Sequence, residues 1–240
     1  MCGSHRVSRR LVSRRDAIAG TGALLAVSAI PFTALRMRLA AAQTPPPNEL
    51  SPAEALERLM QGNARYAAGE PDFSGAVDDQ SESRLPVAAV LACSDSPLSP
   101  ELLFDQAAGD LFVIRNAGNI VTDSSLASLE YAVAFLSVPL LMVLGHANCG
   151  AVGTAFDAVR GRKELPGHLP ELVKAIEPAV IAAHAKHPSD FLAATIEENV
   201  RINVKRLIEA GPILTEALAA KKLAVSGGVH DLAGGTVKLI

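Results

Sequence analysis

Three short runs of apolar residues, uninterrupted by polar ones, constrain the fold of this chain more than any other feature. They cover residues 87–92, 111–114 and 140–144. A strand with one face in water alternates apolar and polar side chains. An unbroken apolar run is instead typical of a strand buried on both faces, as in a parallel sheet covered by helices. The runs therefore predict three strands at the centre of such a sheet.

The segments around these runs predict helices and one or two further strands. Apolar residues recur at helical spacing between Leu126 and Leu136, and Ser51-Pro52-Ala53-Glu54 is typical of a helix start. Further helices are expected near residues 151–160, 170–186 and 189–210, and further strands at 223–226 and 236–240. Strands alternating with helices predict an α/β fold with a mostly parallel central sheet of four to five strands flanked by helices.

The first 42 residues differ in charge and hydropathy from the rest of the chain. They hold seven arginines and one acidic residue, whereas the remaining 198 residues hold 15 basic and 24 acidic side chains. Arg14 and Arg15 precede an apolar run from Ala17 to Phe32, and a stretch of small residues ends at Ala42. This order is the pattern of a secretory signal peptide, and the arginine pair is typical of the twin-arginine type.

The pattern divides the chain into a signal peptide over residues 1–42, a proline-rich linker over 43–50 and a folded domain over 51–240. A retained membrane anchor is the alternative, but an apolar run of 16 residues is shorter than the roughly 20 that a spanning helix needs. We therefore expect export to the periplasm, with no membrane association once the signal is removed. The formal net charge of −3 argues against a nucleic-acid partner.

Two cysteines and one histidine follow the predicted strands of the domain. Cys93 comes directly after the first apolar run, and His146 and Cys149 come after the third. Ligand sites form at the carboxyl ends of parallel strands, so these three side chains are expected to converge. Two thiolates and one imidazole suit a tetrahedral zinc site with a fourth position left for water. On spacing alone, a disulfide between the cysteines and a pair of buried inert thiols are the alternatives.

Three sequence blocks contain or adjoin these residues. They are CSDS at 93–96, GDLFVIRNAGN at 109–119 and GHANCGAV at 145–152. In this order and spacing they resemble the signature blocks of the β-class carbonic anhydrases, and GNARY at 62–66 is similar to the amino-terminal helix of that family. The resemblance runs from about residue 50 to the end of the chain.

The resemblance implies one zinc ion per chain, with Cys93, His146 and Cys149 as ligands. It implies that Asp95 either accepts a hydrogen bond from zinc-bound hydroxide or binds the metal itself in a closed form. Backbone groups near Gly150 would help to hold bicarbonate. The implied activity is the reversible hydration of carbon dioxide to bicarbonate by zinc-bound hydroxide. The implied assembly is a homodimer or a higher homo-oligomer, with the cleft at the dimer interface.

One residue departs from the pattern of the family. The family continues its first block with an arginine that pairs with the aspartate and keeps it off the metal, whereas this chain has Pro97. Because proline cannot form a charge-assisted pair with a carboxylate, we expect Asp95 to be drawn to the zinc and activity to be impaired or gated. Arg115 and Arg84 are the candidates for a replacement arginine.

Two other functions compete with an active carbonic anhydrase. One is a zinc-binding but catalytically silent family member, used for bicarbonate sensing or assembly, and Pro97 favours it. The other is a related hydrolase of carbon disulfide or carbonyl sulfide, which no residue selects. The Asn-Ala-Gly-Asn loop after Arg115 is interpreted as shaping the backbone near the site and the dimer contact, rather than as contacting substrate.

Overall fold

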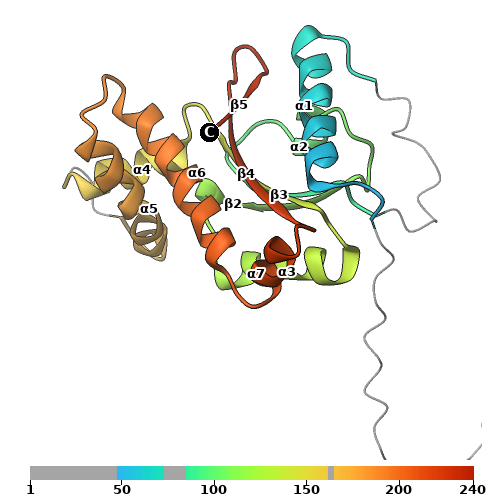
Figure 1. The fold of residues 1–240 in the computed structure, drawn as a ribbon. Coiled ribbons are helices and arrows are strands. Elements are labelled where there is room, and N and C mark those ends of the chain that lie inside the picture. Colours follow the sequence, from blue (N-terminus) through green and yellow to red (C-terminus); the bar gives the residue numbers. More distant parts are fainter. Residues whose placement is uncertain (1–47, 73–84, 162–164) are drawn as a thin grey trace, which may run out of the picture. The chain divides into compact units, whose positions relative to one another are not determined.

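The computed structural model describes residues 48–72, 85–161 and 165–240 of the chain (Figure 1). In chain order, the elements of these ranges are α1 (Pro52–Ala68), β1 (Ala88–Cys93), α2 (Pro100–Leu103), β2 (Leu111–Asn116), η2 (Ala117–Asn119), α3 (Asp123–Leu136), β3 (Leu140–His146), α4 (Gly150–Val159), α5 (Leu169–Ala185), α6 (Phe191–Glu209), α7 (Ile213–Ala219), β4 (Ala224–His230) and β5 (Val237–Leu239). The predicted signal peptide, residues 43–47 of the predicted linker, and Arg84 lie outside the described residues.

The strands form one sheet in the order β2-β1-β3-β4-β5. β1 pairs in parallel with β2 and β3, β3 pairs in parallel with β4, and β5 runs antiparallel to β4. Every residue of β1 and β3 is buried, which explains why neither run alternates with polar residues. The predicted α/β fold with a mostly parallel sheet is confirmed.

Helices cover both faces of the sheet (Figure 1). On one face, α1 packs against alternate residues of the central strands, namely Ala88, Val90, Ala92, Leu140, Met142 and Leu144. On the other face, α3, α6 and α7 pack against the intervening residues, namely Ala89, Leu91, Leu141 and Val143. α4 and α5 pack with α6 in a third apolar cluster, which includes Cys93 and Cys149. This cluster adjoins the carboxyl ends of β1 and β3.

Two features of the sheet and its connections differ from the prediction. The sequence predicts a fourth strand at 223–226, but β4 continues to His230 through two glycines. A Cβ atom at Gly227 would lie 2.7 Å from Val200 of α6, so the strand needs glycine where the helix crosses it. The short helices α2 and α7 were not predicted, because so few residues show no helical period.

The first helix begins where the sequence predicts it. The Ser51 hydroxyl accepts a hydrogen bond from the Glu54 N–H, and the Glu54 carboxylate accepts one from the Ser51 N–H. Just before this cap, the Asn48 amide donates to the Pro86 carbonyl, so the end of the predicted linker contacts the domain. None of the helices in the described part of the chain is long and apolar enough to cross a membrane.

Candidate metal site

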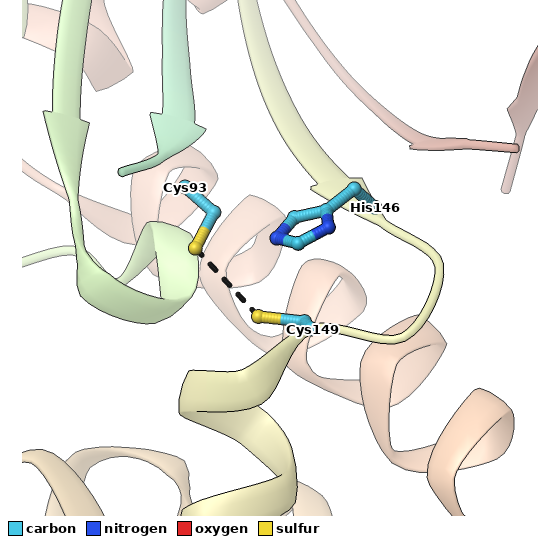
Figure 2. A group of neighbouring side chains, drawn as sticks. All are labelled: Cys93, His146 and Cys149. Carbon is cyan, nitrogen blue, oxygen red and sulfur yellow. Dashed lines mark hydrogen bonds between the residues drawn. The ribbon is translucent and has the colours of Figure 1, made fainter. Parts of the chain in front are cut away.

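The three predicted ligands converge at the carboxyl ends of two neighbouring strands (Figure 2). Cys93 is the last residue of β1, His146 is the last residue of β3, and Cys149 caps the start of α4. Asn148 adopts a left-handed conformation, with φ of 56°, in the tight turn that carries the chain from His146 to Cys149. The ligand atoms all lie within 4.8 Å of one another, and all three residues are buried.

The imidazole of His146 is prepared to bind a metal ion. Its Nδ1 lies 3.0 Å from the Ala147 carbonyl oxygen, to which it donates a hydrogen bond. This bond fixes the tautomer in which Nε2 carries a lone pair. Nε2 is buried and has no hydrogen-bond partner among the described residues, although buried polar atoms normally have one. A metal ion bound by Nε2 and the two sulfurs would explain why this nitrogen has no hydrogen-bond partner.

The two cysteines are free thiols that hydrogen-bond to each other. Their sulfurs lie 3.6 Å apart, well beyond the length of about 2.05 Å of a disulfide bond. The hydrogen bond with Cys149 lowers the pKa of Cys93, helped by the backbone N–H groups of Gly118 and Asp95, against the effect of burial. The same bond, together with burial, raises the pKa of Cys149. A cation that binds both sulfurs displaces the proton between them, so the group fits a zinc ion.

Asp95 lies beside this group and contacts Gly150. Its Oδ2 accepts a hydrogen bond of 2.7 Å from the Gly150 N–H, at the start of α4. A helix N-terminus favours a negative charge at this place. The structure thus brings the two predicted catalytic residues together, while the buried group that could hold a metal ion consists of Cys93, His146 and Cys149. Coordination of a metal by Asp95 stays a prediction.

Arg115 holds the loop that carries Asp95. Its guanidinium donates to three main-chain carbonyl oxygens, with Nη2 at 2.8 Å from Cys93, 3.4 Å from Ser94 and 2.6 Å from Ser96. Within the described ranges, no ion pair joins Arg115 to Asp95. Arg115 therefore acts on the backbone of this loop and does not pair with the Asp95 carboxylate.

Two buried polar groups near the site were not assigned a chemical role from the sequence. His230 pairs with His146 across the strands, and its buried Nδ1 has no partner. Burial lowers the pKa of His230, against the effect of Asp231. Asn199 of α6 contacts the loop after β2. The available signal was the recurrence of Thr195, Asn199 and Asn203 every four residues, which places polar side chains on the apolar face of a helix.

Comparison with known proteins identifies the family. The family model described as carbonic anhydrase matches residues 88–237. Among solved structures, a Coccomyxa β-carbonic anhydrase in complex with acetazolamide is 30% identical, with a TM-score of 0.60, and the match covers 77% of this chain and 84% of that one. This chain belongs to the β-class carbonic anhydrases.

Other proteins similar to this β-carbonic anhydrase are also carbonic anhydrases. The carbonic anhydrase of Mycolicibacterium smegmatis is 34% identical over 196 residues, covering 79% of this chain and 93% of that protein. Carbonic anhydrase 2 of Mycobacterium tuberculosis matches to the same extent. A tetrameric β-carbonic anhydrase of Sordaria macrospora has a TM-score of 0.59 at 27% identity, over 65% of this chain and 81% of that one. The family resemblance seen in the sequence is confirmed.

Proposed function

We propose that this chain catalyses the reversible hydration of carbon dioxide to bicarbonate, with one zinc ion held by Cys93, His146 and Cys149. One observation carries the proposal. The buried Nε2 of His146, which has no partner among the described residues, lies beside two thiols that hydrogen-bond to each other. Membership of the family and the names of the relatives support the same activity.

Zinc at this position supplies a Lewis acid that lowers the pKa of a coordinated water molecule to near 7. Cys93, His146 and Cys149 would hold the ion with three donors, which would leave room for water. The Ala147 carbonyl holds the His146 ring in the ligating tautomer. The Gly150 N–H, at the N-terminus of α4, is suited to hold an anion, and we assign it to bicarbonate.

Asp95, in this proposal, controls access to the fourth position. Its carboxylate is exposed and held by the Gly150 N–H, with no cationic side chain paired to it in the described ranges. Pro97 supplies no charge, and Arg115 is bonded to main-chain carbonyls. The carboxylate is therefore free to exchange between Gly150 and the zinc. Bound to the metal, it would exclude water; bonded to the Gly150 N–H, as here, it would compete with bicarbonate.

A stopped-flow assay of carbon dioxide hydration by zinc-loaded protein, between pH 7 and 9, tests this function. We expect measurable catalysis that increases with pH. Zinc-loaded protein that is inactive across this range would instead be the silent family member that Pro97 favours. Parallel assays with carbonyl sulfide and carbon disulfide test the alternative of a related hydrolase of these compounds. No contact among the described residues favours that alternative.

We also propose that the enzyme assembles as a homodimer or a higher homo-oligomer. Tyr131 and Phe135 of α3 are 50% and 52% exposed, and their rings stack at a centroid distance of 5.2 Å. Phe112 of the edge strand β2 lies beside Tyr131. A second copy of the chain would cover this aromatic surface, and the Sordaria macrospora relative is described as tetrameric.

Export is expected to depend on the arginine pair of the leader. Replacing Arg14 and Arg15 together with lysine should trap the precursor in the cytoplasm, because a twin-arginine signal requires both residues. Immunoblots of cytoplasmic and periplasmic fractions measure the outcome. Replacing Arg9 and Arg10 in the same way is the matched control and should leave export intact. Normal export of the Arg14 and Arg15 variant would rule out this route.

A further inference from the structure

The thiol of Cys93 receives a hydrogen bond from a turn that contains a left-handed glycine. The Gly118 N–H donates to Cys93 Sγ at 3.2 Å. Gly118 lies in η2, directly after β2, with φ of 77°, a left-handed conformation that disfavours other residues. It is also buried, and a Cβ atom there would lie 2.8 Å from Ile176 Cδ1. The direction of this N–H therefore depends on how the surrounding residues hold the turn.

Two buried amides of α6 hold the turn. Asn199 Nδ2 donates to the Gly118 carbonyl at 2.8 Å. One helical turn later, Asn203 Oδ1 accepts from the Val121 N–H at 2.7 Å, and its Nδ2 donates to the Asn199 carbonyl at 2.8 Å. Asn199 is 1% exposed and Asn203 is fully buried. The loop that passes from β2 to α3 is thus fixed to α6 at two points.

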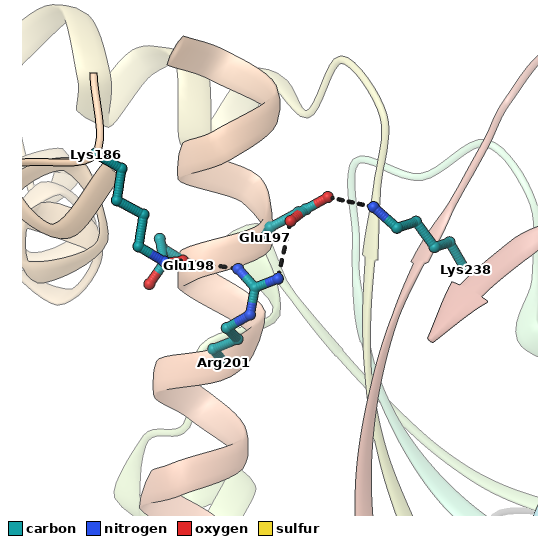
Figure 3. Close-up of polar contacts among 5 residues, drawn as sticks. All are labelled: Lys186, Glu197, Glu198, Arg201 and Lys238. Atoms are coloured by element: carbon teal, nitrogen blue, oxygen red, sulfur yellow. Dashed lines mark hydrogen bonds and ion pairs between the residues drawn. The ribbon is translucent and has the colours of Figure 1, made fainter. Parts of the chain in front are cut away.

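α6 is itself anchored on both sides of Asn199 (Figure 3). Glu198 pairs with Lys186, at the end of α5, at 2.7 Å, and Glu197 pairs with Lys238 of β5 at 3.0 Å. Arg201 joins the two glutamates, at 2.7 Å from Glu198 and 2.9 Å from Glu197. An isolated surface pair contributes little, but a connected network fixes the position of the helix. Asn199 directly follows Glu198, so the ion pairs hold the backbone from which the Asn199 side chain extends.

We propose that Asn199 is a positioning residue for Cys93, acting through Gly118. By holding the Gly118 carbonyl, it aims the N–H of the same turn at the sulfur. An N–H···S bond orients the thiolate and draws electron density from it. Groups that orient metal ligands in this way typically change metal affinity by about 10- to 100-fold when they are removed. This inference rests on the proposed role of Cys93 as a zinc ligand.

The chain offers a matched control in Asn63 of α1. Asn63 is 3% exposed, its Nδ2 donates to the carbonyls of Leu103 and Gly235, and its Oδ1 accepts from the Val237 N–H. Its side chain therefore makes three hydrogen bonds to the backbone, whereas that of Asn199 makes one, and none of the three is to the turn that bonds Cys93. Asn63→Ala and Asn199→Ala both remove a buried amide.

Zinc affinity, measured by competition with a chromophoric chelator, distinguishes the two variants. We expect Asn199→Ala to bind zinc about 10- to 100-fold more weakly than the wild type, and Asn63→Ala to stay close to it. The sulfur-to-metal charge-transfer band of the cobalt-substituted protein gives a readout that a general loss of stability does not move. In Asn199→Ala it should shift to lower energy, because a thiolate without its hydrogen bond donates more readily.

A second variant guards against failure of the first to fold. Asn203→Ala removes the hydrogen bond from Asn203 to the Asn199 carbonyl. It should lower the zinc affinity and shift the charge-transfer band in the same directions as Asn199→Ala, by smaller amounts. Wild-type affinity and an unshifted band in a folded Asn199 or Asn203 variant would overturn the inference and leave the zinc site standing. A wild-type protein that takes up no zinc would overturn the proposed function itself, and the inference with it.

Discussion

Replacing Cys149 with alanine is expected to abolish both hydration activity and the stabilisation of the protein by zinc. In the proposed site Cys149 is one of three zinc ligands, and an ion that binds only the folded state stabilises it by mass action. With free zinc at 100 times its dissociation constant, the wild type should gain about 2.7 kcal/mol of unfolding free energy. For a domain of this size, that gain corresponds to about 5–11 °C in Tm. Thermal unfolding with and without added zinc measures it.

Val152→Ala is the matched control for this variant. Val152 is 1% exposed and lies in the first turn of α4, so its truncation also disturbs the packing of that helix. It should lower Tm by a similar amount with and without zinc, leaving the zinc-dependent gain intact. If Cys149→Ala keeps the full gain, Cys149 is not a ligand. If reductant rather than zinc removal destabilises the wild type, the cysteines form a disulfide.

Pro97→Arg is expected to raise hydration activity by about tenfold or more, which corresponds to roughly 1.4 kcal/mol of barrier. An arginine at this position can pair with the Asp95 carboxylate and draw it from the zinc, which frees the fourth position. The structure has space for the side chain, because Pro97 borders a hollow of about 380 Å³ that is also lined by Tyr66 and His230. Stopped-flow rates at neutral pH measure the effect.

The main confounder of this prediction is the backbone, because proline fixes a φ angle that arginine releases. Pro97→Ala separates the two effects, since it relaxes the backbone without adding charge. An equal gain in the alanine variant would show that strain, and not the missing ion pair, limits the enzyme. A wild type that already turns over at a high rate would show that another residue restrains Asp95.

The sequence alone predicted the central sheet and the convergence of Cys93, His146 and Cys149, because both depend on local signals. β1 and β3 are buried on both faces, which leaves unbroken apolar runs. Cys93 and His146 end those same strands, so the parallel topology places them together. The continuation of β4 through Gly227 could not be predicted, since glycine usually ends a strand and the crossing of α6 is a tertiary contact.

The contacts that support the site are harder to find from sequence because they join distant segments. Asn199 lies 81 residues from the Gly118 carbonyl it holds, and no local pattern records the pairing. Arg115 was identified as a candidate partner of Asp95 by its charge. Its guanidinium instead bonds the main chain of Cys93 and Ser96, where the loop turns back towards β2. Side-chain direction, which the sequence does not encode locally, decides between the two.

X-ray absorption at the zinc edge, on protein isolated from its native compartment, tests the central claim most directly. We expect about one zinc ion per chain, with two sulfur ligands at about 2.3 Å and a nitrogen at about 2.0–2.1 Å. These are the donors that Cys93, Cys149 and His146 provide. Zinc without sulfur ligands, or metal-free protein with Cys93 and Cys149 joined in a disulfide, would contradict the account.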